Sequence, residues 1–230
     1  MQIYGIQKTT LLDYPGKVAA TIFTPGCNFR CPYCYNMRLA ESDINAGNLD
    51  EDEVFAFLTK RKGVLDGICI SGGEPTLQKD LIPFIQKAKG LGYLIKLDTN
   101  GTNPDIIKEL IEKGLIDHIA MDIKSSLSGY PEVSGVKHPD TDAVKKSVLL
   151  LMEKRIPFEF RTTVVREYHN AKVFDEIGGL LRGADPYYLQ SFEDSEAVTD
   201  HSLSSYTKEE LQAFVCQLSE YDINAVIRGQ

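Results

Sequence analysis

The sequence predicts an α/β protein with a mainly parallel sheet, and two observations lead to that class. Along the chain, short runs of apolar and β-branched residues alternate with runs that have helical periodicity. Expected strands begin near residues 67, 93 and 118, about 25 residues apart, which is the length of one strand and one returning helix. Neighbouring strands should therefore be parallel. Six such units make either an open barrel or a doubly wound sheet.

The expected strands are short and largely apolar, as is typical of strands that are buried on both faces. The first follows a Tyr-Pro-Gly turn at 14–16. Six strands belong to the repeating units and a seventh closes the chain; they occupy residues 18–23, 67–71, 93–98, 118–124, 158–165, 187–191 and 223–228.

The expected helices lie between these strands. The first has Val54, Phe55 and Leu58 at helical spacing and acidic residues in its first turn, where the helix dipole favours negative charge. In the last helix, Thr207 and Glu210 are placed as a capping box. The full set occupies residues 49–62, 77–91, 105–113, 141–154, 172–181 and 207–220.

Composition and charge restrict the classes of function. Of the 230 residues, 43% are hydrophobic and 25% are charged, which is the ordinary profile of a folded domain. The net charge of −8 argues against sequence-blind binding of nucleic acid and against a polybasic membrane anchor. The N-terminus has no signal-peptide pattern, and no run approaches the roughly 18 apolar residues of a membrane span. We therefore expect a cytoplasmic protein.

No low-complexity tract, repeat or linker divides the chain, so we expect a single domain over residues 1–230. Its core is expected at about 17–192, with an added C-terminal helix and strand at about 207–228. A domain of this length buries on the order of 70% of its unfolded surface, so it needs no disulfide bonds for stability.

Three of the five cysteines are clustered, at Cys27, Cys31 and Cys34, with the spacing Cys-x3-Cys-x2-Cys. Such clustering indicates metal binding or redox chemistry rather than disulfides. Three thiolates suit zinc or an iron–sulfur cluster, and on a 4Fe–4S cluster they leave one iron open for a substrate. The alternative is a structural zinc with a histidine as fourth ligand, although the four histidines are scattered. Cys69 and Cys216 are expected in the core.

Polar residues cluster where the expected strands end, and the carboxyl ends of parallel strands meet at one edge of a sheet. A Gly-Gly-Glu-Pro loop follows the strand at 67–71, and its two glycines allow close approach of the backbone to a ligand. Acidic, basic and amide side chains lie at the ends of the next four strands. Besides the cysteines, the candidate site residues are Gly72, Gly73, Glu74, Asp98, Thr99, Asp122, Lys124, Arg161 and Gln190.

Two motifs together resemble the radical S-adenosylmethionine (SAM) enzymes. They are the cysteine motif, with Tyr33 before its last cysteine, and the loop Gly72-Gly73-Glu74-Pro75. The resemblance covers nearly the whole chain and implies a single-domain partial (β/α)6 barrel. One departure is Tyr35, which stands where the family often has a histidine directly after the third cysteine. Another is Arg166-Glu167, which replaces turn residues common after the fifth expected strand.

Further segments narrow the resemblance. The sequences LDTNG (97–101), MDIK (121–124) and FRTTVV (160–165) are similar to those of the glycyl-radical enzyme activating enzymes. The opening IQKTT and DYPG segments, with YLQ at 188–190, most resemble the activating proteins of anaerobic ribonucleoside-triphosphate reductases. This resemblance implies abstraction of a glycine Cα hydrogen from a partner enzyme. It also implies a flavodoxin- or ferredoxin-like electron donor.

The resemblance implies a role for each candidate residue. The three cysteines would hold a 4Fe–4S cluster and, with Lys124, form the catalytic set. Lys124 would neutralise the carboxylate of SAM, and the Gly72–Gly73 backbone with Glu74 would meet its amino group. The residues that would contact the ribose or adenine are Tyr33, Arg161 and Gln190. Those that would bind a monovalent cation beside the carboxylate are Asp98, Thr99 and Asp122.

Three alternatives remain open from the sequence. The radical chemistry can act on a small molecule rather than on a protein. The partner can be another glycyl-radical enzyme, such as one of the formate-lyase type. The cysteines can also hold zinc or a cluster in a scaffold without enzymatic activity.

Overall fold

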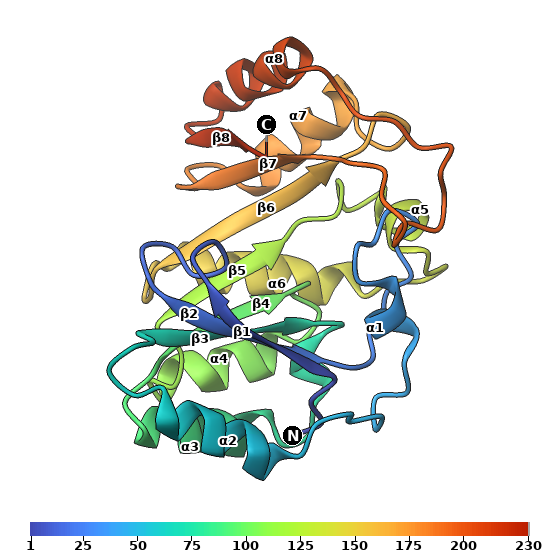
Figure 1. Cartoon of the computed structure of the whole chain (residues 1–230). Coiled ribbons are helices and arrows are strands. Elements are labelled where there is room, and N and C mark those ends of the chain that lie inside the picture. Colours follow the sequence, from blue (N-terminus) through green and yellow to red (C-terminus); the bar gives the residue numbers. More distant parts are fainter. Residues whose placement is uncertain (230) are drawn as a thin grey trace.

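In the computed structural model, which describes residues 1–229, eight strands form one continuous sheet (Figure 1). Gln230, the last residue of the predicted domain, lies outside the described residues. The strands follow one another across the sheet in chain order. They are β1 (Gly5–Thr10), β2 (Ala19–Thr24), β3 (Gly67–Gly72), β4 (Leu94–Thr99), β5 (His118–Asp122), β6 (Phe158–Val164), β7 (Tyr187–Ser191) and β8 (Ala225–Arg228).

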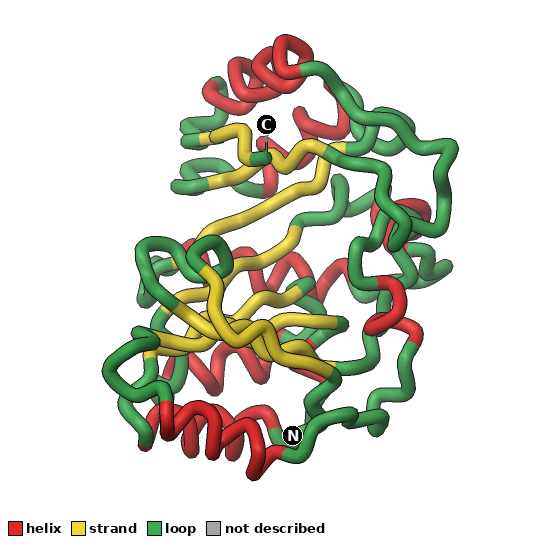
Figure 2. Tube along the Cα trace, viewed as in Figure 1, coloured by secondary structure: helices red, strands yellow, loops and turns green. Residues whose placement is uncertain are grey.

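The strand order decides between the two predicted architectures. A doubly wound sheet reverses its order at a switch point, whereas here every parallel connection from β2 to β8 moves to the next strand in the same direction. Successive crossovers of the same hand place their helices on one side of the sheet. The sheet curls inside them as a partial barrel (Figure 2). The predicted fold class is confirmed.

The six predicted helices are all present in the described chain, with ends that shift by a few residues. Thr207 and Glu210 form the predicted capping box. The second predicted helix begins late, because Pro75–Leu77 forms a 3-10 turn and residues 78–80 form a loop before it. The six are α2 (Glu51–Lys60), α3 (Leu81–Gly90), α4 (Pro104–Glu112), α6 (Thr141–Met152), α7 (Ala171–Leu180) and α8 (Lys208–Ser219).

Three short elements were not predicted. The strand β1 pairs antiparallel with β2 at the edge of the sheet, and it was missed because Gln7, Lys8 and Thr9 are polar and exposed rather than alternating with buried apolar residues. The five-residue helices α1 (Met37–Glu41) and α5 (Tyr130–Ser134) are too short to show helical periodicity.

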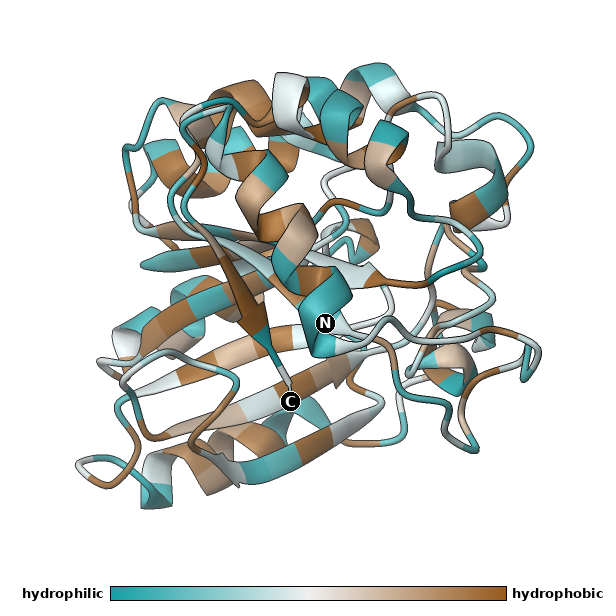
Figure 3. Ribbon diagram, turned by 90° about the horizontal axis from the view of Figure 1, so that it is seen from above, coloured by the Kyte–Doolittle hydropathy of each residue, from teal (hydrophilic) through white to brown (hydrophobic). Residues whose placement is uncertain are grey.

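The two faces of the barrel strands differ in chemistry. In β4, Ile95 and Leu97 belong to the apolar core, while Lys96 and Asp98 lie on the opposite face, inside the barrel. The helices show apolar and hydrophilic residues on different sides in Figure 3, as is typical of helices that cover one face of a sheet. The interior of the barrel is therefore polar and the layer outside it is apolar. Within residues 1–229, no helix has the length and apolar character that spanning a membrane requires.

Candidate active site at the carboxyl end of the barrel

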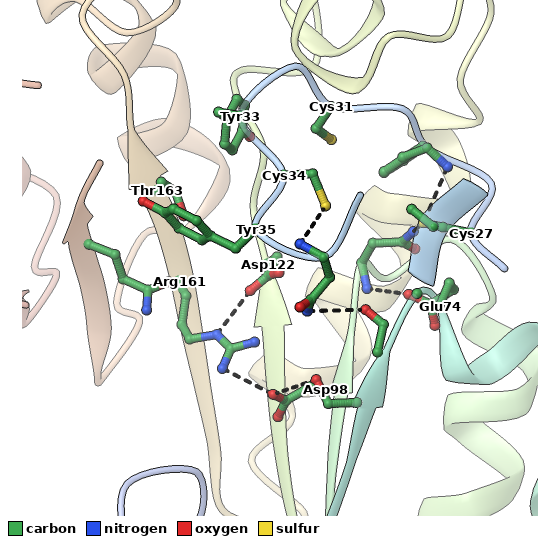
Figure 4. Close-up of a pocket in the computed structure, with 18 of the residues that line it drawn as sticks. Cys27, Cys31, Tyr33, Cys34, Tyr35, Glu74, Asp98, Asp122, Arg161 and Thr163 are labelled. Atoms are coloured by element: carbon green, nitrogen blue, oxygen red, sulfur yellow. Dashed lines mark hydrogen bonds and ion pairs between the residues drawn. The ribbon is translucent and has the colours of Figure 1, made fainter. Parts of the chain in front are cut away.

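A cavity of about 500 Å³ opens at the carboxyl ends of the strands and extends into the barrel (Figure 4). Its volume lies within the range of sites that bind small molecules. All thirteen predicted site residues line it: Cys27, Cys31, Tyr33, Cys34, Gly72, Gly73, Glu74, Asp98, Thr99, Asp122, Lys124, Arg161 and Gln190. The structure thus brings together residues that are up to 163 positions apart in the sequence, from Cys27 to Gln190.

The three clustered cysteines lie on the loop between β2 and α1. Backbone hydrogen bonds hold this loop from two sides: Cys27 N donates to Ala40 O at 3.2 Å, and Arg30 N donates to Ser134 O at 2.7 Å. Gly135 lies directly against Arg30, and a Cβ at Gly135 would be 2.2 Å from Arg30 O. The loop is therefore held in place by contacts made by the polypeptide itself.

The cysteine sulfurs are partly or fully withdrawn from solvent. Phe29 N donates to Cys27 Sγ, and Asn36 N donates to Cys34 Sγ, each at 3.3 Å. Such N–H donors stabilise a thiolate. Burial raises the pKa of the Cys27 thiol to about 12 and that of Cys31 to about 11. Metal binding would have to displace these protons, because cysteine ligates as the thiolate.

The three thiols fit the ligand set of a 4Fe–4S cluster. Such a cluster takes each cysteine at a different iron. Cys27, Cys31 and Cys34 lie on one loop at the mouth of the cavity and could fill three of the four positions.

The Gly72–Gly73 loop packs tightly against the start of the cysteine loop. Gly72 has a φ of 121°, and a Cβ there would be 2.4 Å from Thr24 N. A Cβ on Gly73 would be 1.9 Å from Gly26 O. We expected these glycines to allow approach to a ligand, and the structure shows that they also allow approach to the polypeptide before Cys27. Gly73 N and Glu74 N already donate to Thr24 O and Gly26 O. An ammonium group needs hydrogen-bond acceptors, and the loop can provide them only through its carbonyl oxygens.

Replacing Gly73 with Ala should destabilise the fold, because the added Cβ would clash with the backbone carbonyl oxygen of Gly26, which cannot move aside as a flexible side chain could. Overpacking of this kind costs about 1–3 kcal/mol of unfolding free energy, and sometimes more. Gly179→Ala is the matched control, since nothing lies within 4 Å of its added Cβ in α7. That change should stabilise by about 0.5–1 kcal/mol. Urea unfolding measures both, and equal stabilities for the two variants would contradict the packing described.

Glu74 is 1% exposed, and its carboxylate accepts four hydrogen bonds from within the chain. The donors are Thr76 N at 3.1 Å, Thr76 Oγ1 at 2.6 Å, Thr99 Oγ1 at 2.8 Å and Asn100 N at 2.6 Å. Burial raises its pKa, and these hydrogen bonds act in the opposite direction. The carboxylate therefore ties the end of β3 to the end of β4. Its predicted contact with an amino group stays a prediction.

A cluster of charged residues occupies the inside of the barrel below the cysteine loop. Arg161 bridges two carboxylates, with Nε 2.9 Å from Asp122 Oδ1 and Nη1 3.3 Å from Asp98 Oδ2. Lys124 Nζ lies 3.0 Å from Asp122 Oδ2. Lys96 Nζ donates to Asp98 Oδ1. Each of the four carboxylate oxygens thus meets a cationic group.

These cations control the protonation of the two aspartates. Burial by itself would raise the pKa of Asp122, but Arg161 and Lys124 lower it to about 2. Burial likewise opposes ionisation of Asp98, and Arg161 and Lys96 hold its pKa below the ordinary value. Although burial disfavours the charged amine, Asp122 raises the pKa of Lys124 well above its ordinary value. The two aspartates, Lys124 and Arg161 are therefore ionised at neutral pH.

The depressed pKa of Asp122 predicts a pH dependence of stability. Its ordinary value is 3.8 and its folded value is about 2. The ionised form is favoured in the folded state, so its stabilisation is complete above pH 3.8 and declines as the pH falls toward 2. The difference in unfolding free energy between wild type and Asp122→Asn should stay constant from about pH 7 to 5 and shrink below about 4. A difference that grows on acidification would contradict the ion-pair assignment.

Tyr33 and Gln190 complete the predicted residues that line the cavity. Tyr33 is 3% exposed, and its hydroxyl has no hydrogen-bond partner among the described residues. Gln190 lies in β7 beside Thr163 of β6. Tyr35, the residue that departs from the resemblance, accepts a hydrogen bond from Glu193 N at 2.7 Å and stacks on Phe192. Tyr35 thereby connects the cysteine loop to the segment after β7.

The two cysteines outside the motif differ from one another. Cys69 is 0% exposed within β3, as expected. Cys216 was also expected in the core, but it is exposed on α8. That expectation was wrong because the helix buries Leu211, Phe214 and Leu218 instead, which lie on its other face.

Two buried charged residues of the barrel interior were not predicted as part of the site. Lys96 is 1% exposed, and Glu159 is 2% exposed and accepts from Arg228 at 3.1 and 3.2 Å. Each follows the period of two along its strand, with Lys96 two residues before Asp98 and Glu159 two before Arg161. That spacing is the signal that could have placed them inside the barrel.

Residues 21–175 match the model of the Radical SAM superfamily, and the chain belongs to that superfamily. The chain is also 34% identical to a Methanocaldococcus jannaschii protein named "Putative glycyl-radical enzyme activating enzyme", over 98% of this chain and 95% of that protein. Within the superfamily it therefore groups with the glycyl-radical enzyme activating enzymes. The predicted radical SAM enzyme is confirmed, as are the 4Fe–4S cluster and SAM that this superfamily uses.

Two solved structures resemble the fold. A domain of pyruvate-formate lyase-activating enzyme from Bacteroides vulgatus has a TM-score of 0.58 at 20% identity, covering 71% of this chain and 99% of that one. Streptococcus suis SuiB bound to its precursor peptide SuiA has a TM-score of 0.68 at 16% identity. That match covers 91% of this chain and 48% of SuiB. At these identities both structures bear on the fold alone.

Proposed function

We propose that this enzyme abstracts a hydrogen atom from a glycine Cα of a partner protein, and that the partner is the anaerobic ribonucleoside-triphosphate reductase. The observation that carries the proposal is the shared cavity: the cysteine loop, the Gly72–Gly73 loop and the charged cluster all line it. The similarity to the archaeal protein supports a protein substrate. The IQKTT, DYPG and YLQ segments support the reductase as the particular partner.

The chain's own residues bind and orient the cofactors in this proposal. When bound, the 4Fe–4S cluster supplies the electron that cleaves SAM into methionine and a 5′-deoxyadenosyl radical. Cys27, Cys31 and Cys34 hold the cluster. The carbonyl groups of the Gly72–Gly73 loop accept from the amino group of SAM, and Lys124 pairs with its carboxylate. Tyr33, Arg161 and Gln190 line the space left for the ribose and adenine, and Glu74 positions the loop.

The reaction partners follow from the same proposal. Glycine suits a radical at Cα because, without a side chain, the centre can flatten between its two amide groups. The electron comes from a flavodoxin- or ferredoxin-like protein. We place the enzyme in the cytoplasm, because three clustered thiols need a reducing compartment to remain available as ligands.

The decisive experiment is anaerobic incubation of the reconstituted enzyme with reductant, SAM and the reductase. A glycyl radical should appear in the paramagnetic resonance spectrum of the reductase. Deuterium placed at the glycine Cα should be recovered in 5′-deoxyadenosine. A reductase in which that glycine is replaced by Ala is the control and should give neither signal. Efficient SAM cleavage without transfer of the label would refute the proposed substrate.

Two other assignments are tested by the same assay. A formate-lyase-type partner is the first alternative, and the glycyl radical would then form only on that protein. A small-molecule substrate is favoured by a 7-carboxy-7-deazaguanine synthase of Koribacter versatilis. That synthase is 25% identical over 68% of this chain and 66% of its own length. Turnover of a small molecule without any protein partner would support the second assignment.

A further inference from the structure

The lysine inside the barrel, Lys96, has no solvent to stabilise its charge. Its side chain is 1% exposed, and its ammonium group donates to Asp98 Oδ1. Its other neighbour within reach is Cys69 Sγ, at 3.9 Å. A buried ammonium without a partner is strongly unfavourable, so the Lys96–Asp98 pair is held as a unit on the inner face of β4.

The resemblance placed a monovalent cation at Asp98, Thr99 and Asp122, but these residues do not fit one in this chain. Alkali cations require oxygen ligands. Both oxygens of Asp98 are engaged, by Lys96 and by Arg161 at 3.3 Å. Both oxygens of Asp122 are engaged, by Arg161 at 2.9 Å and by Lys124 at 3.0 Å. Thr99 Oγ1 donates to Glu74 at 2.8 Å and accepts from Gly101 N at 3.1 Å.

The charges point the same way. An added alkali ion would lie beside Lys96, Lys124 and Arg161, which between them contact the same two carboxylates. Repulsion between like charges is unfavourable in a largely buried site.

We propose that the Lys96 ammonium takes the place of a bound monovalent cation, so that SAM binding by this enzyme requires no potassium or sodium. Lys96 is then a positioning residue that acts through Asp98 and Arg161 on the neighbouring SAM site. The inference rests on the SAM site of the proposed function.

The first test compares two salts on the reconstituted wild-type enzyme alone. The dissociation constant of SAM is measured in potassium chloride and in tetramethylammonium chloride at equal ionic strength, since tetramethylammonium is too large for an alkali-ion site. The two values should agree within about twofold. A loss of affinity of about tenfold or more without potassium, equivalent to about 1.4 kcal/mol, would overturn the inference. This comparison is decisive even if variants at Lys96 fail to fold.

The second test creates the cation site that Lys96 is proposed to replace. In Lys96→Ser, Asp98 Oδ1 loses its partner and space opens beside it. SAM binding should weaken by about tenfold or more in tetramethylammonium chloride and recover in potassium or ammonium chloride. The matched control is Lys89→Ser, which removes a lysine paired with Asp117 at 2.8 Å outside the barrel and should show no dependence on the cation. Loss of binding that neither cation restores would refute the proposed role.

A readout without cofactors separates this inference from the proposed function. In the cluster-free protein, potassium should raise the midpoint of thermal unfolding of Lys96→Ser but not that of wild type or Lys89→Ser. A wild type that binds no SAM in either salt would contradict the proposed SAM site, and the unfolding midpoints would still decide the role of Lys96. Equal responses of all three proteins to potassium would count against it.

Discussion

Replacing Cys31 with Ala is expected to abolish assembly of the 4Fe–4S cluster and, with it, all SAM cleavage. Cys31 is the central cysteine of the motif and is 6% exposed at the cavity. Two thiolates cannot replace three, because each ligates a different iron and the water that would replace the third is a weak ligand for iron. Iron and sulfide content, together with the yield of 5′-deoxyadenosine after anaerobic reconstitution, measure the loss. Product should not exceed the protein-free background.

The two cysteines outside the motif provide the controls for this experiment. Cys216→Ala changes an exposed position on α8, and Cys69→Ala changes a buried position in β3. Both variants should retain about four irons per chain and wild-type activity. A Cys31→Ala enzyme that keeps its cluster and cleaves SAM would remove the basis for the assignment of the ligands.

Replacing Arg161 with Met is expected to cause the largest loss of folding stability. Its side chain is 14% exposed, and its guanidinium is shared by Asp98, Asp122 and, at 3.9 Å, Glu159. Removing one member of a buried ion network leaves the opposite charges uncompensated and costs about 3–5 kcal/mol. The pKa values of Asp98 and Asp122 should rise as a result. Urea unfolding measures the first effect, and carboxyl-carbon resonance shifts measure the second.

Arg166→Met is the matched control for Arg161→Met. Arg166 also binds a carboxylate, with Nη1 2.9 Å from Glu210 Oε1, but it does so on the surface. Solvent and salt screen exposed pairs, so the loss should be much smaller than at Arg161. If the two variants lost the same stability, burial of the inner cluster would not be the source of its effect.

A helix or strand could be predicted from the sequence where its own residues show a helical or strand pattern. Apolar strands such as β3 and the capping box of α8 can be read directly from the residues. Strand order has no local signal, and for that reason the residues alone left a barrel and a doubly wound sheet open. The edge strand β1 also lacks a local sequence signal, because its exposed residues are polar. Hydrogen bonds to its single partner strand, β2, stabilise it instead.

The site was predictable for residues at strand ends and less so for residues within strands. All thirteen candidates line the cavity because parallel strands bring their carboxyl ends to one edge. The period of two places Lys96 on the same face as Asp98, but a lysine in the apolar run YLIKLD gives no sign of which residues it contacts. The internal hydrogen bonds of Glu74 depend on Thr76 and Asn100, whose positions follow only from the folded loops.

The sequential strand order has a consequence for how the protein is made. Each strand can pair, once synthesised, with the strand made just before it. The cysteine loop and the Gly72–Gly73 loop that packs on it are both present early in the nascent chain, because synthesis is vectorial. Cotranslational folding can therefore begin with the part of the protein that receives iron.

Later segments complete the enclosure of that loop in two stages. Ser134 accepts from Arg30 first, and the backbone of Thr199 and Asp200 then reaches Pro32 O at 3.3 Å. The ribosome needs about 3–13 s to add the residues between these two points at ordinary elongation rates. During that interval one flank of the loop remains open on the ribosome. The cysteine loop is therefore enclosed on the side of Ser134 before it is enclosed on the side of Thr199 and Asp200.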